Sequence, residues 1–280
     1  MGKLYLVATP IGNLEDISAR ALRVLREVRL IAAEDTRQTA KLLNHYAIQT
    51  ALTSYHEHNK LVKLDQILAA LAEGDVALVS DAGTPALNDP GYELVRAALQ
   101  AGYEVSPIPG PSAPVSALVA SGLPTDSFLY LGYLPRKSAE RRRELAKVKD
   151  LPYTLIFLEA PHRLLASLED LCHVLGDRAC ALARELTKVH EEIFRGSLSE
   201  AREYFQANPP RGEFTLVVAG SERSLQTWTE EELRQAALQD LASGLSPSQT
   251  ANRLAGEANW PKRKVYKLVM DLVENPTENQ

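Results

Sequence analysis

The sequence has no closely spaced glycines. Fifteen glycines are present, and no two are nearer than eight positions, as at Gly83 and Gly91. A dinucleotide fingerprint needs three glycines within six positions and a P-loop needs two at a spacing of five. Both nucleotide cradles are therefore excluded, and so is the glycine-rich loop of Rossmann-type methyltransferases.

Cysteine and clustered metal ligands are also scarce. The two cysteines, Cys172 and Cys180, are too few for a disulfide framework or a structural zinc site. We predict that both are core thiols, which suits a reducing cytoplasm. No HExxH or GxSxG motif occurs, and His56 and His58 lack a third ligand nearby, so no metal is predicted.

Long hydrophobic runs are missing as well. The apolar stretch at the N-terminus is only about six residues, too short for a signal-peptide core or a membrane span. We therefore predict a cytoplasmic protein with no membrane partner. The net charge of −5 argues against wholesale nucleic-acid binding. Residues 136–149, however, hold seven basic and two acidic side chains, either as a solvated helix face or as a phosphate-binding surface.

Strand-like runs alternate with helical periods along most of the chain. Candidate strands are 3–9, 29–34, 76–80 and 103–108, then 127–133, 153–159, 178–185 and 213–220. This alternation predicts an α/β fold: a largely parallel sheet in residues 1–115, and a second α/β domain with mixed strand directions in 116–222. After a linker at 221–226, residues 223–280 read as three short helices, either helix-turn-helix-like or a packing bundle.

Four loops rich in proline, glycine and small residues follow candidate strands. They are ATPIGN (8–13), SDAGTP (80–85), PGPSAP (109–114) and LEAPHR (158–163). Ligands of α/β sheets bind outside the carboxyl ends of the strands, and small residues allow a flat ligand to approach the backbone. Any one loop reads equally as a tight connection, but the four together predict a cleft.

A set of motifs resembles one family. The motifs are VATPIGNLEDIS (7–18), AAEDTR (32–37), HEHN (56–59), VSDAGTPALNDPG (79–91), PIPGPSA (107–113), APHRL (160–164) and ARELTK (183–188). They are similar to the tetrapyrrole methylase superfamily, and within it to the branch that methylates 16S ribosomal RNA at a cytidine 2′-oxygen. The tetrapyrrole-acting branch has a GDP-type tripeptide where this chain has Gly83, Thr84 and Pro85, which favours the RNA branch.

The resemblance implies two α/β domains with S-adenosylmethionine in the cleft between them, and a homodimer. It further implies methyl transfer to a cytidine ribose 2′-hydroxyl in the decoding region of 16S rRNA, on the small ribosomal subunit. The residues it assigns to the cofactor are Pro10, Asp81, Ala82, Gly83, Leu87, Ser112, Ala113, Phe157, Leu158 and Thr187.

A weakly acidic 2′-hydroxyl needs a general base or a hydrogen-bonding carboxylate as it attacks. The matching motifs offer Glu34, Asp35, His56 and Glu185, although Asp35 is equally suited to cap a helix. Polar and basic candidates for RNA contact are Asn13, Arg37, Asn59, Arg163, Arg141, Arg142, Lys262 and Arg263. Two alternatives stay open: a tetrapyrrole methyltransferase of the corrinoid or siroheme pathways, and a non-catalytic nucleic-acid-binding regulator.

Overall fold

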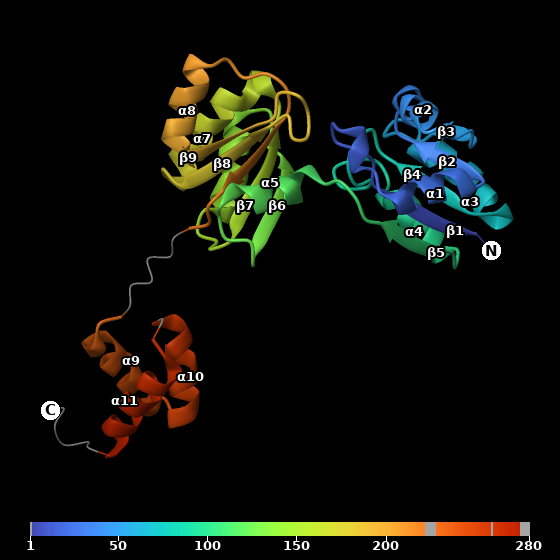
Figure 1. The fold of residues 1–280 in the computed structure, drawn as a ribbon. Coiled ribbons are helices and arrows are strands. Elements are labelled where there is room, and N and C mark those ends of the chain that lie inside the picture. Colours follow the sequence, from blue (N-terminus) through green and yellow to red (C-terminus); the bar gives the residue numbers. More distant parts are fainter. Residues whose placement is uncertain (1, 222–227, 259, 275–280) are drawn as a thin grey trace. The chain divides into compact units, whose positions relative to one another are not determined.

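The structure is a computed structural model that describes residues 2–221, 228–258 and 260–274. Contacts divide the chain into two units, Met1–Gly220 and Ser221–Gln280. The predicted linker at 221–226 lies almost wholly outside the described residues. Within the first unit the elements form two sheets, each with its own helices (Figure 1). The predicted domain boundary at 115/116 falls inside one helix, α5 (Ala113–Ser121), and it stays a prediction.

The first sheet is wholly parallel. Its strands are β1 (Lys3–Val7), β2 (Leu30–Ala33), β3 (Leu52–Ser54), β4 (Val76–Val79) and β5 (Glu104–Ile108), in the order β3-β2-β4-β1-β5. All four residues of β4 are buried, as expected for a central parallel strand covered on both faces.

Helices cover both faces of this sheet. On one face α1 (Ala19–Glu27) and α2 (Thr36–His45) pack over a core that includes Val7, Ile31 and Val79. On the other face α3 (Lys60–Glu73) and α4 (Tyr92–Gln100) pack over Leu4, Val76 and Leu78. The crossovers that leave the neighbouring strands β1 and β4 therefore go to opposite faces. This divergence is the topological switch point at which ligands of α/β sheets bind.

The second sheet has mixed directions, as predicted. Its strands are β6 (Phe128–Tyr133), β7 (Thr154–Glu159), β8 (Ala179–Arg184), β9 (Glu192–Ser197) and β10 (Phe214–Val218). The order is β6-β7-β10-β8-β9, with β6 and β7 parallel and the other pairs antiparallel. Helices α6 (Ser138–Val148), α7 (Leu164–Leu175) and α8 (Leu198–Ala207) cover one face, and α5 covers the other. The sequence analysis missed β3, β9 and α8.

The second unit has a small core of its own. Helices α9 (Glu230–Ala242), α10 (Pro247–Glu257) and α11 (Lys262–Glu274) bury residues such as Leu233, Leu254 and Val269 against one another. Ser246 and Gln249 form the capping box that begins α10. None of the described helices is both long and apolar enough to cross a bilayer.

A buried ion-pair cluster joins α6 to α7. Asp170 is 2% exposed and accepts hydrogen bonds from Arg141 Nε at 2.7 Å and Arg142 Nε at 2.5 Å. Ser138 Oγ donates to the same carboxylate at 3.0 Å. The charged partners hold the pKa of Asp170 below its usual value against the opposing effect of burial. Arg141 is itself 3% exposed, and Asp170 supplies the counter-charge to its buried guanidinium.

We expect Asp170→Ala to destabilise the first unit by about 3–5 kcal/mol, because it leaves the buried Arg141 charge uncompensated. Both tryptophans, Trp228 and Trp260, lie in the second unit. Thermal unfolding followed by far-UV circular dichroism should therefore shift downwards, while the tryptophan fluorescence transition stays in place. Arg142→Ala is the matched control and should cost far less, because that side chain is 42% exposed. Equal shifts in the two variants would contradict this account.

Candidate active site

Three of the proline- and glycine-containing loops are tied together at the carboxyl edge of the first sheet. The loops after β1 and β4 exchange two backbone hydrogen bonds, Thr9 N to Gly83 O at 2.9 Å and Gly83 N to Thr9 O at 3.0 Å. Thr84 Oγ1 adds a bond to the Pro111 carbonyl in the loop after β5 at 3.3 Å. Gly83 has a φ of +77°, a conformation that glycine adopts without steric cost.

Two carboxylates fasten the turn after β2 to the same edge. Asp81 accepts a hydrogen bond from the Asp35 N–H at 3.0 Å, and Glu34 accepts one from the Asp81 N–H at 3.2 Å. This reciprocal pair fixes the AEDTR and SDAGTP segments against each other. The positions of Glu34 and Asp81 are thus set by backbone groups.

A cavity of about 260 Å³ lies between these loops and the second sheet. The first sheet contributes its loop residues and the second contributes the ends of β6, β7, β8 and β10. The lining comprises Ile11, Glu34, Asp81, Ala82, Gly83, Thr84, Leu87, Asn88, Asp89, Ser112, Ala113, Pro114, Tyr130, Tyr133, Leu158, Ala183, Glu185, Leu186, Lys188, Glu213, Phe214 and Thr215. All four predicted loops contribute at least one residue.

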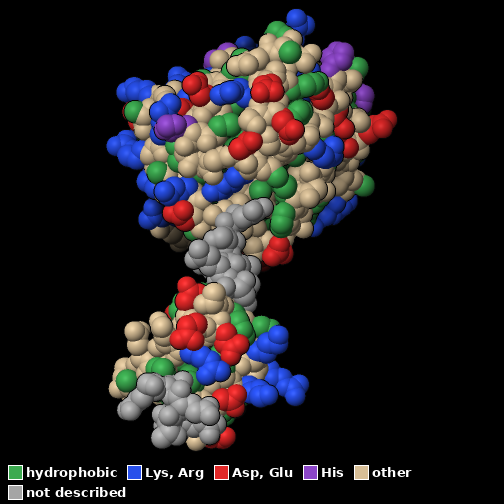
Figure 2. Space-filling model, turned by 90° about the vertical axis from the view of Figure 1, so that its left-hand side faces the viewer, with side chains coloured by type: hydrophobic (Ala, Val, Ile, Leu, Met, Phe, Trp, Pro, Cys, Tyr) green, Lys and Arg blue, Asp and Glu red, His purple; other side chains and the backbone are tan. Residues whose placement is uncertain are grey.

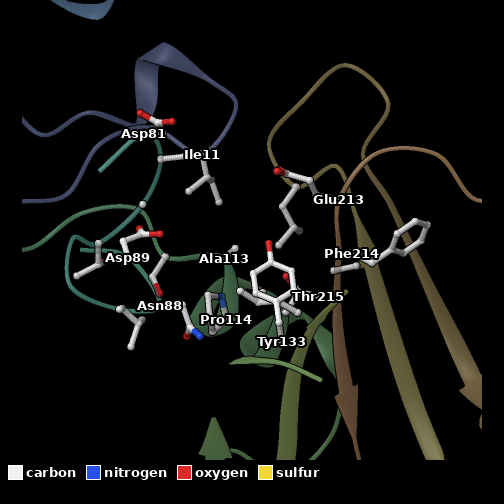
Figure 3. Close-up of a pocket in the computed structure, with 18 of the residues that line it drawn as sticks. Ile11, Asp81, Asn88, Asp89, Ala113, Pro114, Tyr133, Glu213, Phe214 and Thr215 are labelled. Carbon is white, nitrogen blue, oxygen red and sulfur yellow. The ribbon is translucent and has the colours of Figure 1, made fainter. Parts of the chain in front are cut away.

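Tyrosines of β6 form part of the opposite wall. Figure 3 shows Asp81, Asp89 and Asn88 on one side of the cavity, with Tyr133, Thr215 and Glu213 on the other. A register shift between Tyr130 and Gly132 interrupts the β6–β7 pairing. A Cβ at Gly132 would meet the Asn88 amide at 2.3 Å, so this glycine allows the loop after β4 to approach β6 closely.

The pKa is raised for the acidic side chains that the first sheet contributes to the cavity, Glu34, Asp81 and Asp89. Burial is the main cause for Glu34 and for Asp81, and neighbouring carboxylates add to it. The effect is larger at Asp89, where burial and then the Glu34 charge raise the pKa to about 6. Asp35 behaves oppositely, because Arg37 holds its pKa near about 2.

Most of the predicted cofactor residues line this cavity. They are Asp81, Ala82, Gly83, Leu87, Ser112, Ala113 and Leu158. Pro10 instead lines a neighbouring hollow with Thr9 and Asp81, and Thr187 lines another with Gly12 and His190. The Phe157 side chain is fully buried in the core of the second sheet and faces away from the cavity.

The predicted catalytic residues are divided between the cavity and its surroundings. Glu34 and Glu185 line it. Asp35 lies outside it and begins α2 as the N-cap, accepting from the Arg37 N–H at 2.8 Å. His56 also lies outside the lining, and its buried Nδ1 has no hydrogen-bond partner among the described residues.

The predicted RNA-contact residues are scattered over the molecule. Asn13 caps the short η1 helix (Leu14–Asp16), Asn59 braces its own turn by accepting from the His56 N–H, and Arg37 pairs with Asp35. These side chains hold local structure.

The basic candidates of the second sheet are engaged with acidic partners. Arg163 pairs with the buried Glu159 at 3.2 Å, and the half-exposed Arg142 pairs with Asp170. Arg141 is buried against Asp170, which leaves its guanidinium no surface for a phosphate. We therefore leave Arg141 out of any RNA-binding surface. Lys262 and Arg263 are exposed at the start of α11.

Several cavity residues were not found from the sequence. Tyr130, Tyr133 and Thr215 are on strands whose inward positions depend on the fold, and no motif marks them. Asn88 and Asp89 stand within VSDAGTPALNDPG, but the asparagine, aspartate and proline there read as turn residues. Among the described residues, no group of three or more His, Cys, Asp or Glu side chains is arranged to hold a metal ion.

The architecture and the cavity at the switch point correspond to a known class of enzyme. The family model of the tetrapyrrole (corrin/porphyrin) methylases matches residues 3–202. The chain therefore belongs to the tetrapyrrole methylase family, and the predicted fold class is confirmed.

Its relatives define a narrower group. A ribosomal RNA small subunit methyltransferase I from Synechocystis is 49% identical over 275 residues, covering 97% of this chain and 99% of the relative. The protein of the same name from Escherichia coli O157:H7 is 48% identical over 277 residues, covering 96% and 95%. The predicted resemblance to this methyltransferase group is confirmed.

A solved structure shares the fold at low sequence identity. Uroporphyrin-III C-methyltransferase from Thermus thermophilus, complexed with S-adenosyl homocysteine, superposes with a TM-score of 0.54 at 21% identity. The match covers 77% of this chain and 97% of that one. This likeness concerns the fold.

We expect Asp89→Asn to make the protein more stable than the wild type at pH 8, with the gain shrinking towards pH 4.5. The folded state raises the pKa of this acid from 3.8 to about 6, so the native state binds the proton more tightly than the unfolded state. The wild-type protein therefore loses stability as the pH rises from 3.8 through about 6, where Asp89 ionises. The asparagine side chain of the variant carries no charge at any pH, so the variant has no such loss. Melting temperatures at the two pH values measure the effect. Asp65→Asn, exposed on α3, should give the same difference at both.

Proposed function

We propose that this chain transfers a methyl group from S-adenosylmethionine to the ribose 2′-hydroxyl of a cytidine in the decoding region of 16S rRNA. The acceptor is presented by the small ribosomal subunit, and the reaction belongs to the cytoplasm. The observation that carries the proposal is a sequence match, at 48–49% identity and over nearly the full length of both chains, to relatives named ribosomal RNA small subunit methyltransferase I.

The cavity supports the cofactor assignment. Its first-sheet wall is made of backbone and small side chains at Ala82, Gly83 and Ala113, against which a flat adenosine or an extended methionine chain can lie. Leu87 and Leu158 supply apolar contacts, and Asp81 and Ser112 supply polar ones. About 260 Å³ is close to the lower end of the range of small-molecule pockets, about 300–1,000 Å³. These residues fit the group.

S-adenosylmethionine, when bound, supplies a methyl group already activated on a sulfonium. The protein's task is then mainly to hold the acceptor oxygen in line with that methyl and to accept its proton. The loops are suited to positioning, because Thr9 and Gly83 are paired through the backbone and Glu34 and Asp81 lock the turn after β2. Asp35 and His56, which we hypothesise from the sequence to face the acceptor hydroxyl, stand next to this edge without lining the cavity.

A homodimer is also part of the proposal, and an exposed apolar patch supports it. The Lys60–Glu93 ion pair, at 2.6 Å, holds the N-terminal ends of α3 and α4 together. Beside it Leu61, Val62 and Tyr92 are 71%, 83% and 66% exposed. Such a patch is suited to burial against another protein surface.

The first test is transfer of a labelled methyl group to small subunits that lack the modification, with naked 16S rRNA in parallel. We expect label on a cytidine ribose after nuclease digestion of RNA from the subunits. The ribose assignment follows from resistance of the labelled linkage to alkaline hydrolysis, because the cleavage needs a free 2′-hydroxyl. Tight binding of S-adenosyl homocysteine without label in either RNA would contradict the RNA acceptor and favour a small molecule such as a tetrapyrrole.

The exposed basic side chains of α11 give a second test. Figure 2 shows Lys and Arg side chains gathered on one side of the smaller unit. We expect Lys262→Ala with Arg263→Ala to weaken subunit binding and to lower the slope of log affinity against log salt by about 2, because each residue would neutralise one phosphate. The matched control is Lys63→Ala with Arg96→Ala, on α3 and α4, which should leave the slope unchanged. An unchanged slope in the α11 variant would remove this surface from the proposal.

A further inference from the structure

Carboxylates line both walls of the cavity, and most of them are already engaged. The oxygens of Glu34 and Asp81 accept backbone N–H groups at 3.2 and 3.0 Å. On the other wall Glu185 accepts the Glu213 N–H and the Lys188 ammonium, each at 2.9 Å. Glu213 reaches the same ammonium at 3.2 Å. Each of these groups has a structural partner that a proton transfer would disturb.

Asp89 differs from all of them. Among the described residues, no backbone N–H and no cationic side chain donates to its carboxylate, and the Ser80 hydroxyl beside it donates to the Ala82 carbonyl at 3.2 Å. The side chain is half-buried and faces the cavity (Figure 3). Neither of its oxygens is therefore engaged by a backbone or cationic donor, whereas Glu34, Asp81, Glu185 and Glu213 each have one oxygen engaged in this way.

The loop around Asp89 is rigidly built. Asn88 before it has a φ of +65°, and Pro90 after it restricts the backbone further. A Cβ at Gly91 would lie 2.6 Å from the Ala86 Cβ and 2.9 Å from a Leu78 methyl, so the loop is packed tightly onto β4. The backbone that carries Asp89 is therefore restricted on both sides of the residue.

We propose that Asp89 is the general base that accepts the proton of the acceptor 2′-hydroxyl, an inference that rests on the proposed function. As the ribose oxygen forms its bond to the methyl carbon, the bond from that carbon to sulfur breaks and its electron pair stays on sulfur. The hydroxyl proton passes to the Asp89 carboxylate. The cationic sulfonium and the carboxylate thus become a neutral thioether and a neutral acid, and charge is balanced.

The surroundings of Asp89 adjust its basicity for this role. The titratable groups that face it are Glu34 after β2, Asp81 after β4, and Tyr130 and Tyr133 on β6. Burial raises the pKa of both tyrosines, that of Tyr130 to about 12, so they stay neutral at pH 7. With a pKa of about 6, Asp89 is mostly ionised at pH 7 and is a stronger base than an ordinary carboxylate.

The test compares Asp89→Asn with the wild-type protein in single turnovers on small subunits lacking the methyl group, with the cofactor saturating. We expect the rate to fall about 10²–10⁴-fold, the range for loss of a general base. The wild-type rate should rise with pH through an inflection near about 6, and the variant should lack it. Calorimetry with S-adenosyl homocysteine should give unchanged affinity, and Asp89→Glu should recover part of the rate.

Each contrary result has a distinct meaning. If Asp89→Asn keeps a rate within tenfold of wild type and keeps the inflection of rate against pH, the role of Asp89 is wrong. The role is also wrong if the variant binds S-adenosyl homocysteine so much more weakly that weaker binding explains the slower rate. An inflection that disappears in Glu34→Gln but persists in Asp89→Asn would assign the base to Glu34. Asp65→Asn controls for the loss of a carboxylate elsewhere. A wild-type protein that methylates no subunit RNA would overturn the proposed function itself, and this inference with it.

Discussion

The site depends on one short backbone pairing, between Thr9 and Gly83. Strands β1 and β4 are neighbours, but their crossovers leave for opposite faces of the sheet, so the loops that follow them diverge. Two N–H···O bonds, at 2.9 and 3.0 Å, hold the loops together just beyond the point of divergence. The left-handed conformation of Gly83 makes this pairing possible. Without it the loop after β4 would be fastened only through Asp81 to the turn after β2 and through Thr84 to the loop after β5.

The same constraint accounts for the electrostatics of the cavity. Drawing the turn after β2 and the loop after β4 to one edge brings Glu34, Asp81 and Asp89 close together, where burial raises the pKa of all three, Asp81 adds to the rise at Glu34, and Glu34 and Asp81 add to the rise at Asp89. Backbone donors offset part of this cost at Glu34 and Asp81, but among the described residues none donates to Asp89. An acid kept in such surroundings costs stability at neutral pH. That pattern is typical of residues retained for function rather than for folding.

Much of the fold could be predicted from the sequence, because the central strands are runs of apolar residues and the loops after them are rich in proline, glycine and small residues. The buried runs of β4 and β10, and the helical periods between the strands, were sufficient to predict two α/β domains. Strands β3 and β9 could not be predicted in this way: β3 has only three residues, and β9 has no buried residue and no alternating apolar pattern. The burial of Arg141 was equally hidden, because a run of arginines reads as a solvated face until Asp170, 29 positions away, is known to lie beneath it. Tyr133 faces the cavity only as a result of the irregularity at Gly132.

The groups that would hold the cofactor differ in kind from those that would distinguish one acceptor from another. The cofactor wall consists mainly of backbone and small side chains, and such a surface can be shared by members of a family that act on different acceptors. What distinguishes acceptors must then come from groups that vary around it, such as Thr84 in place of an acid, the tyrosines of β6, or the exposed cations of α11. The cations act through salt-dependent affinity, whereas Asp89 acts on the reacting proton. Changes at the two sites should consequently affect different steps, subunit binding for the cations and proton transfer for Asp89.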